Sequence, residues 1–152
     1  MNAVATVPGT VTPLPVSDFM SSPVLTVRGS ASALQALELM QKRHVAHLVV
    51  VDDKDCVTGV LSDADLRSAQ PSVVLVPDAA NRAKALSLLR VGDVMSAHPR
   101  TARADWSAVK VLQVMQDTRV SSIPVIDADG HPVGVVTGMD VVRLTLRLLL
   151  PG

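Results

Sequence analysis

Apolar residues recur at intervals of three and four in two stretches of the chain, Ser32 to Arg43 and Ser107 to Thr118. The positions that define the pattern are Ala33, Leu34, Leu37 and Met40 in the first stretch and Ala108, Val109, Leu112 and Met115 in the second. Because this spacing puts the apolar side chains on one face of a helix, both stretches are predicted to be amphipathic α-helices.

Short β-rich runs surround each predicted helix. "VLTV" and "RTAR" precede the two helices, "HLVVVD" and "CVTGVLS" follow the first, and "SIPVID" and "PVGVVT" follow the second. The polar connectors "DKD" and "ADGH" join the runs of each following pair, so each pair is predicted to be a hairpin. A further helix is predicted to begin near Ser62 and near Thr137. Both halves of the chain therefore have the order βαββα.

This common order reflects an internal repeat. When the chain is aligned with itself at an offset of 75 residues, no gap is needed. The identical pairs include Asp18/Asp93, Met20/Met95, Thr26/Thr101, Leu37/Leu112, Met40/Met115, Val45/Val120, Asp52/Asp127, Gly59/Gly134 and Asp65/Asp140. An ungapped match over about fifty residues indicates two copies of one structural unit.

The repeat divides the chain into four parts. Residues 1–15 carry three prolines and no periodic pattern, so we expect a loose arm. Residues 16–70 form the first repeat, 71–90 a linker, and 91–152 the second repeat with a C-terminal helix. The linker segment "DAANRAKALSLLR" is predicted to be a helix with Asp78 near its cap. Since each unit covers only one sheet face with its own helices, we expect the two units to pack together and share a core.

Composition limits the possible partners and surroundings. Apolar residues make up 48% of the chain, and 14 basic residues balance 14 acidic ones. With no net charge and only Phe19 and Trp106 as aromatics, neither nucleic acid nor a membrane surface is an expected partner. Cys56 is the single cysteine, which excludes an internal disulfide. No apolar run reaches the length of a membrane span, so we expect a soluble, cytoplasmic protein.

Several phrases of the repeat resemble a known family. They are "DFM" and "DVM" at the start of each copy, "ALELM" and "VLQVM", "HLVVVD" and "SSIPVID", and the closing "GVLSDADLR" and "GVVTGMDVVR". These residues resemble the CBS (cystathionine-β-synthase-type) domain in its tandem pair, over about residues 16–147. The first copy departs from the family pattern, with Val49 where the second has Pro124.

The resemblance implies a fold and a function. The fold is α/β (α+β), with two βαββα repeats that are related by a pseudo-two-fold axis and enclose two clefts. Such clefts bind adenosine-containing ligands, among them AMP, ADP, ATP and S-adenosylmethionine, and the family uses them for regulation and not for catalysis. The resemblance also implies a homodimer and a regulated protein on a separate chain, with no required cofactor. The many leucines at the C-terminus are expected to cover a partner subunit.

The closing phrases "SDAD" and "TGMD" have two interpretations. In the first, Ser62 and Thr137 cap the following helices while Asp65 and Asp140 bond back to the caps, an arrangement worth about 1 kcal/mol. A glycine three residues before each cap then permits close approach of another backbone segment.

In the second interpretation the same residues bind a ligand. By resemblance, the hydroxyl residue contacts a phosphate, the aspartate holds a ribose, and the glycine leaves bare backbone for the sugar. The adenine is expected near the threonines of the first strands and near "VAHL" and "VSSIP". The candidate ligand-binding residues are Thr26, Ala46, His47, Gly59, Ser62 and Asp65 in the first repeat, and Thr101, Arg119, Ser121, Ser122, Ile123, Pro124, Gly134, Thr137 and Asp140 in the second.

The two copies differ in charge. Asp63 adds a carboxylate beside the expected phosphate position of the first copy, where the second has Gly138. Because this charge opposes a phosphate by about 1 kcal/mol, the cleft of Thr137 and Asp140 is predicted to bind phosphorylated ligands more tightly. The candidates for neutralising a phosphate are Arg119, Arg43, His44 and His47.

Three alternatives compete with the nucleotide sensor. The first is a ligand-free dimerisation or scaffold protein in which the paired phrases only cap helices. The second, a hydrolytic enzyme, has no support from a nucleophile elbow or a glycine-rich phosphate fingerprint. The third, a metal site at His44 and His47, lacks a further ligand at a diagnostic spacing, so no metal is expected.

Overall fold

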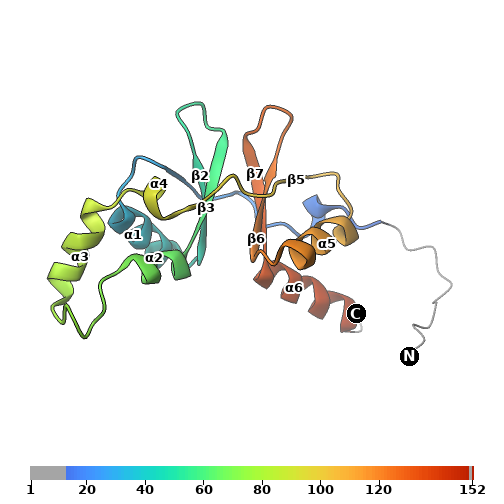
Figure 1. Ribbon diagram of the computed structural model, residues 1–152. Helices are drawn as coiled ribbons and strands as arrows, with labels where there is room; N and C mark the ends of the chain where they lie inside the picture. Colours follow the sequence, from blue (N-terminus) through green and yellow to red (C-terminus); the bar gives the residue numbers. More distant parts are fainter. Residues whose placement is uncertain (1–12, 151) are drawn as a thin grey trace.

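The computed structural model describes residues 13–150 and residue 152. These residues form two sheets whose hairpins stand side by side, and the helices of each repeat lie on the outer side of its own sheet (Figure 1). Both halves have the predicted βαββα order. The first repeat consists of β1 (Thr26–Arg28), α1 (Ala33–Arg43), β2 (His47–Val51), β3 (Val57–Ser62) and α2 (Asp63–Ala69). The second consists of β5 (Ala102–Arg103), α5 (Ala108–Thr118), β6 (Ser122–Ile126), β7 (Pro132–Thr137) and α6 (Gly138–Leu149).

Short elements precede and link the repeats. They are the 3-10 helix η1 (Val16–Asp18), α3 (Ala79–Leu88), α4 (Val91–Val94) and β4 (Ser96–Ala97). Helix α3 begins as the sequence predicts, because the Asp78 side chain accepts a hydrogen bond from the Ala80 N–H.

Equivalent residues end the first helix of each repeat. Ser32 and Ser107 cap α1 and α5 by accepting hydrogen bonds from the backbone N–H three residues later. At the other end, His44 and Arg119 both adopt the left-handed conformation, with φ of 54° in each case. The chain therefore leaves both helices in the same direction and enters β2 and β6 from equivalent positions.

The sheets of the two repeats have the same pairing. In each, the first strand is parallel to the second and the second is antiparallel to the third. The register shifts between Val50 and Val51 in β2 and between Val125 and Ile126 in β6, which are equivalent positions. The repeat seen in the sequence therefore extends to the local irregularities of the strands.

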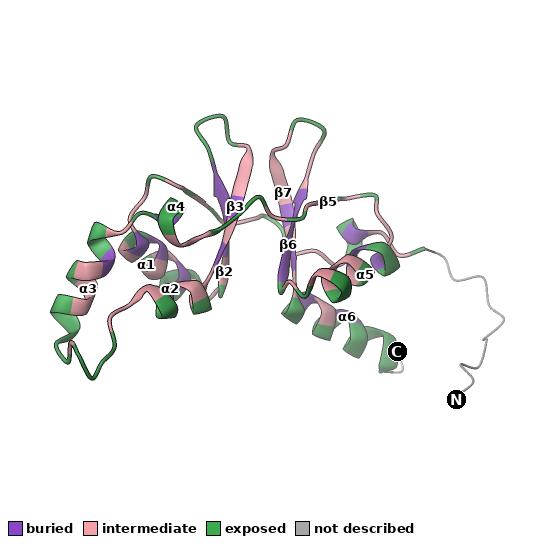
Figure 2. Cartoon of the chain, in the orientation of Figure 1, coloured by how far each residue is buried: buried purple, intermediate pink, exposed green. Residues whose placement is uncertain are grey.

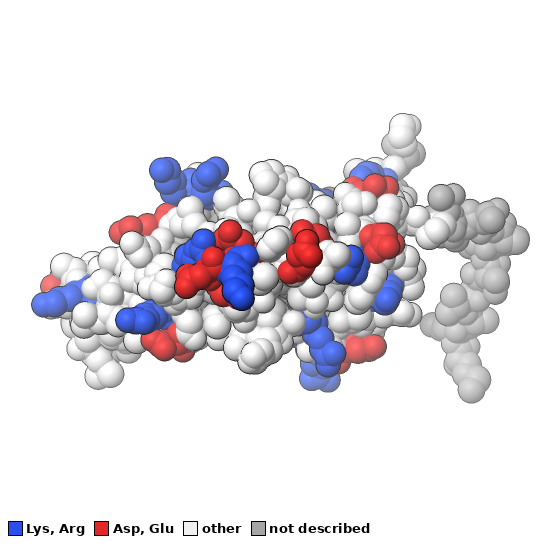
Figure 3. Space-filling view, turned by 90° about the horizontal axis from the view of Figure 1, so that it is seen from above, with Lys and Arg blue, Asp and Glu red and all other residues white. Residues whose placement is uncertain are grey.

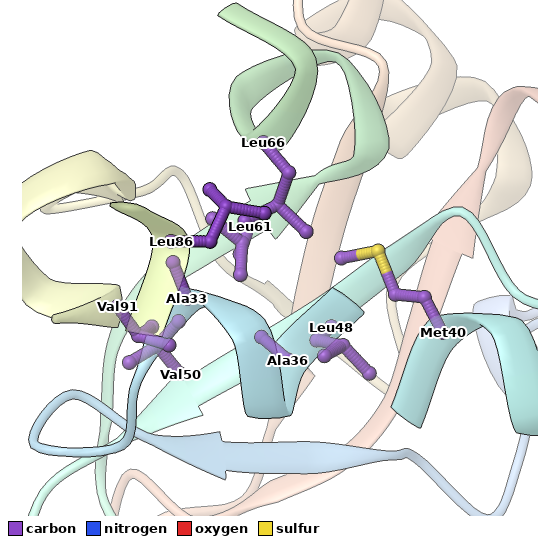
Figure 4. Close-up of a cluster of buried hydrophobic side chains, with 9 residues drawn as sticks. All are labelled: Ala33, Ala36, Met40, Leu48, Val50, Leu61, Leu66, Leu86 and Val91. Atoms are coloured by element: carbon purple, nitrogen blue, oxygen red, sulfur yellow. The ribbon is translucent and has the colours of Figure 1, made fainter. Parts of the chain in front are cut away.

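Each repeat has its own core on the helix side of its sheet. In the first, α1 and the strands enclose a cluster of nine buried residues (Figure 4): Ala33, Ala36, Met40, Leu48, Val50, Leu61, Leu66, Leu86 and Val91. In the second, the buried cluster contains Val16, Ala102, Val111, Ile123, Val125 and Val136. Burial is concentrated in the strands, while the hairpin tips and the outer helix faces are exposed (Figure 2).

The expectation that the two repeats share one hydrophobic core is wrong. The two clusters are separate, and the repeats meet instead through the opposite faces of their sheets, where β3 contacts β6 and β2 contacts β7. Val49 and Pro124, the equivalent residues at which the copies differ, are buried but belong to neither cluster.

The opening segments of the two repeats are exchanged. The N–H of Val16 donates to the Trp106 carbonyl at 2.8 Å, and Ser21 exchanges two backbone hydrogen bonds with Val135 of β7. Reciprocally, β4, which opens the second repeat, pairs with β3 at Gly59 and Val60. Each sheet is therefore completed by chain that belongs, in sequence, to the other repeat.

The end regions are only partly described. Residues 1–12 of the expected arm lie outside the described residues, while the Leu14 carbonyl accepts a hydrogen bond from the Ala108 N–H at 2.7 Å. Viewed onto the hairpins, acidic and basic side chains lie intermixed (Figure 3). Arg28 and Asp55 form an ion pair at 2.9 Å. In the part of the chain that the structure describes, no helix has the length and apolar character needed to cross a membrane.

Candidate ligand-binding site

The closing phrases do cap their helices. Ser62 Oγ accepts a hydrogen bond from the Asp65 N–H at 3.1 Å, and Asp65 Oδ2 accepts one from the Ser62 N–H at 2.8 Å. In the second repeat, both the N–H and the hydroxyl of Thr137 donate to Asp140 Oδ2, at 2.8 and 3.0 Å. The predicted bond from each aspartate back to its cap is thus confirmed in both repeats.

The remaining oxygen distinguishes the two aspartates. Asp140 Oδ1 accepts a 2.6 Å hydrogen bond from Ser21 Oγ and a 3.3 Å bond from Arg143 Nη1, and the residue is only 3% exposed. Asp65 Oδ1 has no protein donor among the described residues, and Asp65 is half-buried at the wall of a cavity. An acceptor is therefore available to a ligand in the first repeat, whereas the corresponding one is occupied in the second.

The cavity at Asp65 measures about 440 Å³ and lies where the two repeats meet. Its walls come from the end of β3 and the start of α2, from the α5–β6 corner, and from the segment that follows β4. Six of the predicted site residues line it: His47, Ser62, Asp65, Arg119, Ser121 and Ser122. The structure therefore brings together residues from both repeats, as a cleft between them requires.

One wall of this cavity was not predicted from the sequence. His98, Pro99 and Arg100 line it, although none of them was a candidate. The available signal was their position directly before Thr101, which the repeat had already marked as a contact near the adenine. Thr101 itself is half-buried and does not line the cavity.

Two other candidates, Asp140 and Thr26, line cavities separate from the one at Asp65. Asp140 lines a separate cavity of about 430 Å³ together with Ser21, Pro23 and Arg143. Thr26 lies in another cavity, of about 480 Å³, beside His131 and away from Asp140. Thr26, a candidate of the first repeat, therefore does not line the cavity at Asp65.

Several other candidates have structural roles. Ile123 is fully buried in the second core, and Pro124 is buried between the sheets. The Ala46 carbonyl accepts a hydrogen bond from the Asp63 N–H at 2.9 Å, and the equivalent Ser121 carbonyl accepts one at 3.2 Å from the first residue of α6. These carbonyls belong to the segments expected near the adenine, and they already bond to the starts of α2 and α6.

The paired glycines make room for methionines. A Cβ at Gly59 would collide with the side chain of Met95, and a Cβ at Gly134 would collide with that of Met20. The expectation that these glycines leave bare backbone for a sugar is corrected by this packing. They instead allow the exchanged opening segments to lie close against β3 and β7.

His47 connects the repeats at the centre of the molecule. Its Nε2 lies 3.3 Å from Ser121 Oγ. Burial lowers the pKa of His47, because desolvation disfavours the charged imidazolium, and the nearby carboxylates of Asp63, Asp65 and Asp140 offset part of this effect. Near neutral pH the ring is therefore predominantly uncharged, and it acts in the cavity as a hydrogen-bonding group.

The predicted ranking of the clefts rested on a free charge at Asp63. In the structure, Asp63 forms an ion pair with Arg67 at 2.7 Å, one helical turn away. This pairing reduces the repulsion that a phosphate in the first cleft would meet. The greater affinity of the second cleft stays a prediction that only a binding measurement can decide.

No metal-ligand group involves His44 or His47 in the described residues. The one grouping of three potential ligands there is Asp127, Asp129 and His131, in the β6–β7 turn. Asp127 Oδ1 already accepts the backbone N–H groups of the other two residues at 2.9 and 3.0 Å. The carboxylate of Asp127 therefore has a structural role in this turn.

Two βαββα units that exchange opening segments and enclose a cavity between them define a tandem α/β fold built from two copies of one unit. The family model of the CBS domain matches residues 16–72 and 91–147. The chain belongs to the CBS domain family, and it carries two copies of the domain. The sequence-based assignment of the family and of the fold class is thus confirmed.

Relatives of this chain that contain CBS domains come from very different organisms. A CBS domain-containing protein of Dictyostelium discoideum is 29% identical over 136 residues, which cover 90% of this chain and 94% of that protein. CBSX2 of Arabidopsis thaliana is a chloroplastic protein that is 31% identical over 152 residues, covering 88% of this chain and 64% of CBSX2. A crystal structure of CBSX2 superposes with a TM-score of 0.75 at 30% identity, covering 90% of this chain and 97% of that one.

Some related structures contain ligands. CBSX2 has been crystallised with AMP, and that structure has a TM-score of 0.70 at 31% identity, covering 89% of this chain and 98% of that one. The CBS domain pair of MJ0100 was crystallised with 5′-methylthioadenosine and S-adenosyl-L-methionine. It has a TM-score of 0.72 at 26% identity, covering 88% of this chain and 96% of that one. CBS pairs similar to this chain thus bind adenosine-type ligands.

Other relatives are larger enzymes that match this chain over a part of their length. Arabinose 5-phosphate isomerase KdsD of Pseudomonas aeruginosa is 30% identical over 108 residues, which cover 71% of this chain but 30% of the isomerase. The similarity is therefore to a CBS-containing part of such proteins, and their catalytic activities do not follow from it.

Proposed function

We propose that this protein senses an adenosine-containing ligand in the cavity at Asp65 and transmits its binding to a partner protein. The observation that carries the proposal is the free acceptor of Asp65. Its Oδ2 is held by the Ser62 N–H, while its Oδ1 has no protein donor in the described part of the chain. A carboxylate oriented in this way can accept hydrogen bonds from ribose hydroxyls, each worth about 1.5–3 kcal/mol.

The size and construction of the cavity fit such a ligand. Its volume of about 440 Å³ lies within the range of about 300–1,000 Å³ that is typical of small-molecule sites. Ser62 and Asp65 come from the first repeat, while Arg119 and Ser121 come from the second. A ligand that contacts both repeats favours one relative position of the two over others, which is the change that a partner protein can recognise.

Similar proteins support the choice of ligand class. CBSX2 was crystallised with AMP, and the MJ0100 pair with 5′-methylthioadenosine and S-adenosyl-L-methionine. The adenosine group is common to all three ligands, so we assign it as the group that the cavity recognises. The candidate ligands to be compared are AMP, ADP, ATP and S-adenosylmethionine.

Calorimetry on matched variants tests this proposal. Asp65→Asn keeps an oxygen for the cap but removes the charge that favours the ribose hydroxyls, so it is expected to weaken binding at least about tenfold, equivalent to about 1.4 kcal/mol. Asp140→Asn changes the equivalent residue of the other repeat and is expected to leave this binding unchanged. The reverse result would establish the second cleft as the tighter site, as the charge difference between the copies predicts.

A thermal-shift panel separates the sensor from a ligand-free scaffold. A ligand at one hundred times its dissociation constant adds about 2.7 kcal/mol of stability. Stabilisation by at least one adenosine compound is expected, and no stabilisation by any of them at millimolar concentration would leave the scaffold function.

We also propose that two copies associate through α6. Val142, Leu146 and Leu149 follow one another at helical spacing along its surface and are 49%, 52% and 74% exposed. Apolar residues arranged in this way favour burial against another surface, and a second copy presents the same complementary face.

A further inference from the structure

We propose that Ser21 and Arg143 form an internal lock on Asp140, and that this lock restricts ligand binding to the first cleft. The lock consists of the two hydrogen bonds that these side chains donate to Oδ1 of Asp140. It rests on the proposed function, because it determines which of the two equivalent aspartates takes the ligand. It goes beyond that function, since two side chains of the protein decide how many ligand molecules one chain binds.

The carboxylate of Asp140 has protein donors on both of its oxygens. Thr137 donates to Oδ2 through its N–H and its hydroxyl, at 2.8 and 3.0 Å. Ser21 Oγ donates to Oδ1 at 2.6 Å, and Arg143 Nη1 donates to the same oxygen at 3.3 Å. Because Asp140 is only 3% exposed, a ribose hydroxyl reaches Oδ1 only after the bond from Ser21 is broken.

The backbone holds Ser21 in position for this bond. Its N–H donates to the Val135 carbonyl at 2.9 Å, and its carbonyl accepts from the Val135 N–H at 3.1 Å. The preceding residue, Met20, packs against Gly134 of β7. Since the segment is already fixed, little conformational entropy is lost when the hydroxyl bonds to Asp140, and the contact competes effectively with a ligand group.

The first repeat lacks this lock. At the offset of 75 residues, Ser96 stands where the second cleft has Ser21. Ser68 stands where the second cleft has Arg143, so the first repeat has no cationic group at this position. Both Ser96 and Ser68 are exposed, and neither donates to Asp65 among the described residues. Asp65 therefore keeps Oδ1 for a ligand.

Space does not distinguish the two aspartates. The cavity at Asp140 measures about 430 Å³ and the cavity at Asp65 about 440 Å³. Ser21 and Arg143 both line the cavity at Asp140, so the lock lies within it. The two cavities thus differ in the donors at the aspartate and not in the room for a ligand.

The lock also connects ligand access to the contact between the repeats. Ser21 belongs in sequence to the first repeat and Asp140 to the second. A ligand at Asp140 must therefore displace a segment of the other repeat. The free energy of this displacement is subtracted from the free energy of binding, so the affinity of the second cleft is reduced.

Calorimetry with adenosine as the probe counts the available sites. Adenosine carries the ribose without a phosphate, so its binding reports on the two aspartates alone. The wild-type chain is expected to bind about one adenosine. The double variant Ser21→Ala with Arg143→Gln is expected to bind a second one, with an affinity within about tenfold of the first. Ser96→Ala removes the equivalent serine of the first repeat and is expected to leave one site.

Transfer of the arginine to the first repeat tests the lock in the opposite direction. Ser68→Arg changes an exposed residue of α2 and places a guanidinium three residues after Asp65, which is the spacing of Arg143 and Asp140. It is expected to weaken adenosine binding about threefold, because the arginine competes for the carboxylate. Ser68→Gln, which adds a side chain without charge, is the matched control and is expected to bind adenosine as the wild type does.

The outcomes separate the lock from the proposed function. If adenosine binds to neither the wild type nor any variant, the proposed function fails. If the wild type binds two adenosine molecules equally well, or if the folded double variant still binds one, the adenosine site stands and the lock is overturned. If the double variant does not fold, Ser68→Arg decides, and unchanged adenosine affinity in that variant contradicts the lock.

Discussion

The hydroxyl of Ser21 donates a 2.6 Å hydrogen bond to Oδ1 of Asp140, across 119 positions of the sequence. Ser96 and Asp65 are the equivalent pair by the repeat, but no such bond joins them in the described structure. One cleft is thus closed at its aspartate by the protein itself, while the other leaves an acceptor for a ligand. The equivalent aspartates Asp65 and Asp140 therefore differ in whether a carboxylate oxygen is free to bind a ligand.

Removing the Ser21 hydroxyl should destabilise the protein. Ser21→Ala deprives the buried Asp140 carboxylate of its shortest hydrogen bond, and this loss is expected to cost about 1–3 kcal/mol. Urea denaturation measures the difference in the free energy of unfolding. The control Ser96→Ala alters the equivalent exposed serine and should change stability by about 0.5 kcal/mol or less. Equal effects of the two substitutions would contradict the difference between the clefts.

Adding a methyl group at Gly59 should disturb the packing of Met95. Gly59→Ala is expected to cost about 1–3 kcal/mol in the free energy of unfolding, because its Cβ would collide with the Met95 side chain and the Ser96 carbonyl. Gly138→Ala is the control, since nothing lies within 4 Å of a Cβ there. In the double variant Gly59→Ala with Met95→Ala, part of the cost should be recovered, and strict additivity would argue against the collision.

The stability of the protein should depend on the protonation of His47. Its pKa is lowered by burial, so below the ordinary value of 6.5 the unfolded chain takes up the proton before the folded chain does. The free energy of unfolding is therefore expected to fall as the pH decreases from 6.5 through the lowered pKa, and His47→Gln should reduce this slope. NMR titration of the His47 ring measures the pKa directly, and a value above 6.5 would disprove the argument.

Introducing a charge on α6 should prevent self-association. Leu149→Glu places a carboxylate on the exposed apolar face of this helix and is expected to convert the proposed dimer to a monomer. Leu88→Glu makes the same change at a leucine of α3 that is 77% exposed, and it should leave the dimer intact. Sedimentation analysis distinguishes the outcomes. A wild-type protein that is monomeric at micromolar concentration would exclude association through this face.

The local structure was largely predictable from the sequence because it depends on short-range patterns. Helix α5 was predicted from spacing alone and differs from the prediction only in that Ser107 is its cap. The bond between Ser62 and Asp65 was predictable because both residues lie within one turn. Even the pairing of Asp63 with Arg67 could have been anticipated, since four residues is the spacing at which charges meet on a helix.

The contacts between repeats were not predictable in this way. The apolar character of Val16 and Met20 shows that they are to be buried, but it does not say against which of two similar sheets. Both sheets have a glycine at the equivalent position, Gly59 in β3 and Gly134 in β7. The local sequence therefore does not determine which of the two sheets each opening segment packs against. The cavity wall at His98 and Arg100 depends on that choice, and for this reason it could be recognised only in the folded structure.

The exchange of opening segments also determines what can fold independently. Residues 16–72 match one complete copy of the CBS domain, yet this stretch lacks Met95 and the strand that covers β3 at Gly59. Expressed by itself, it would have an uncovered strand edge and an opening segment without its own sheet, both of which a second molecule of the same piece could satisfy. We therefore expect the pair of repeats, and not either half by itself, to fold as one cooperative unit.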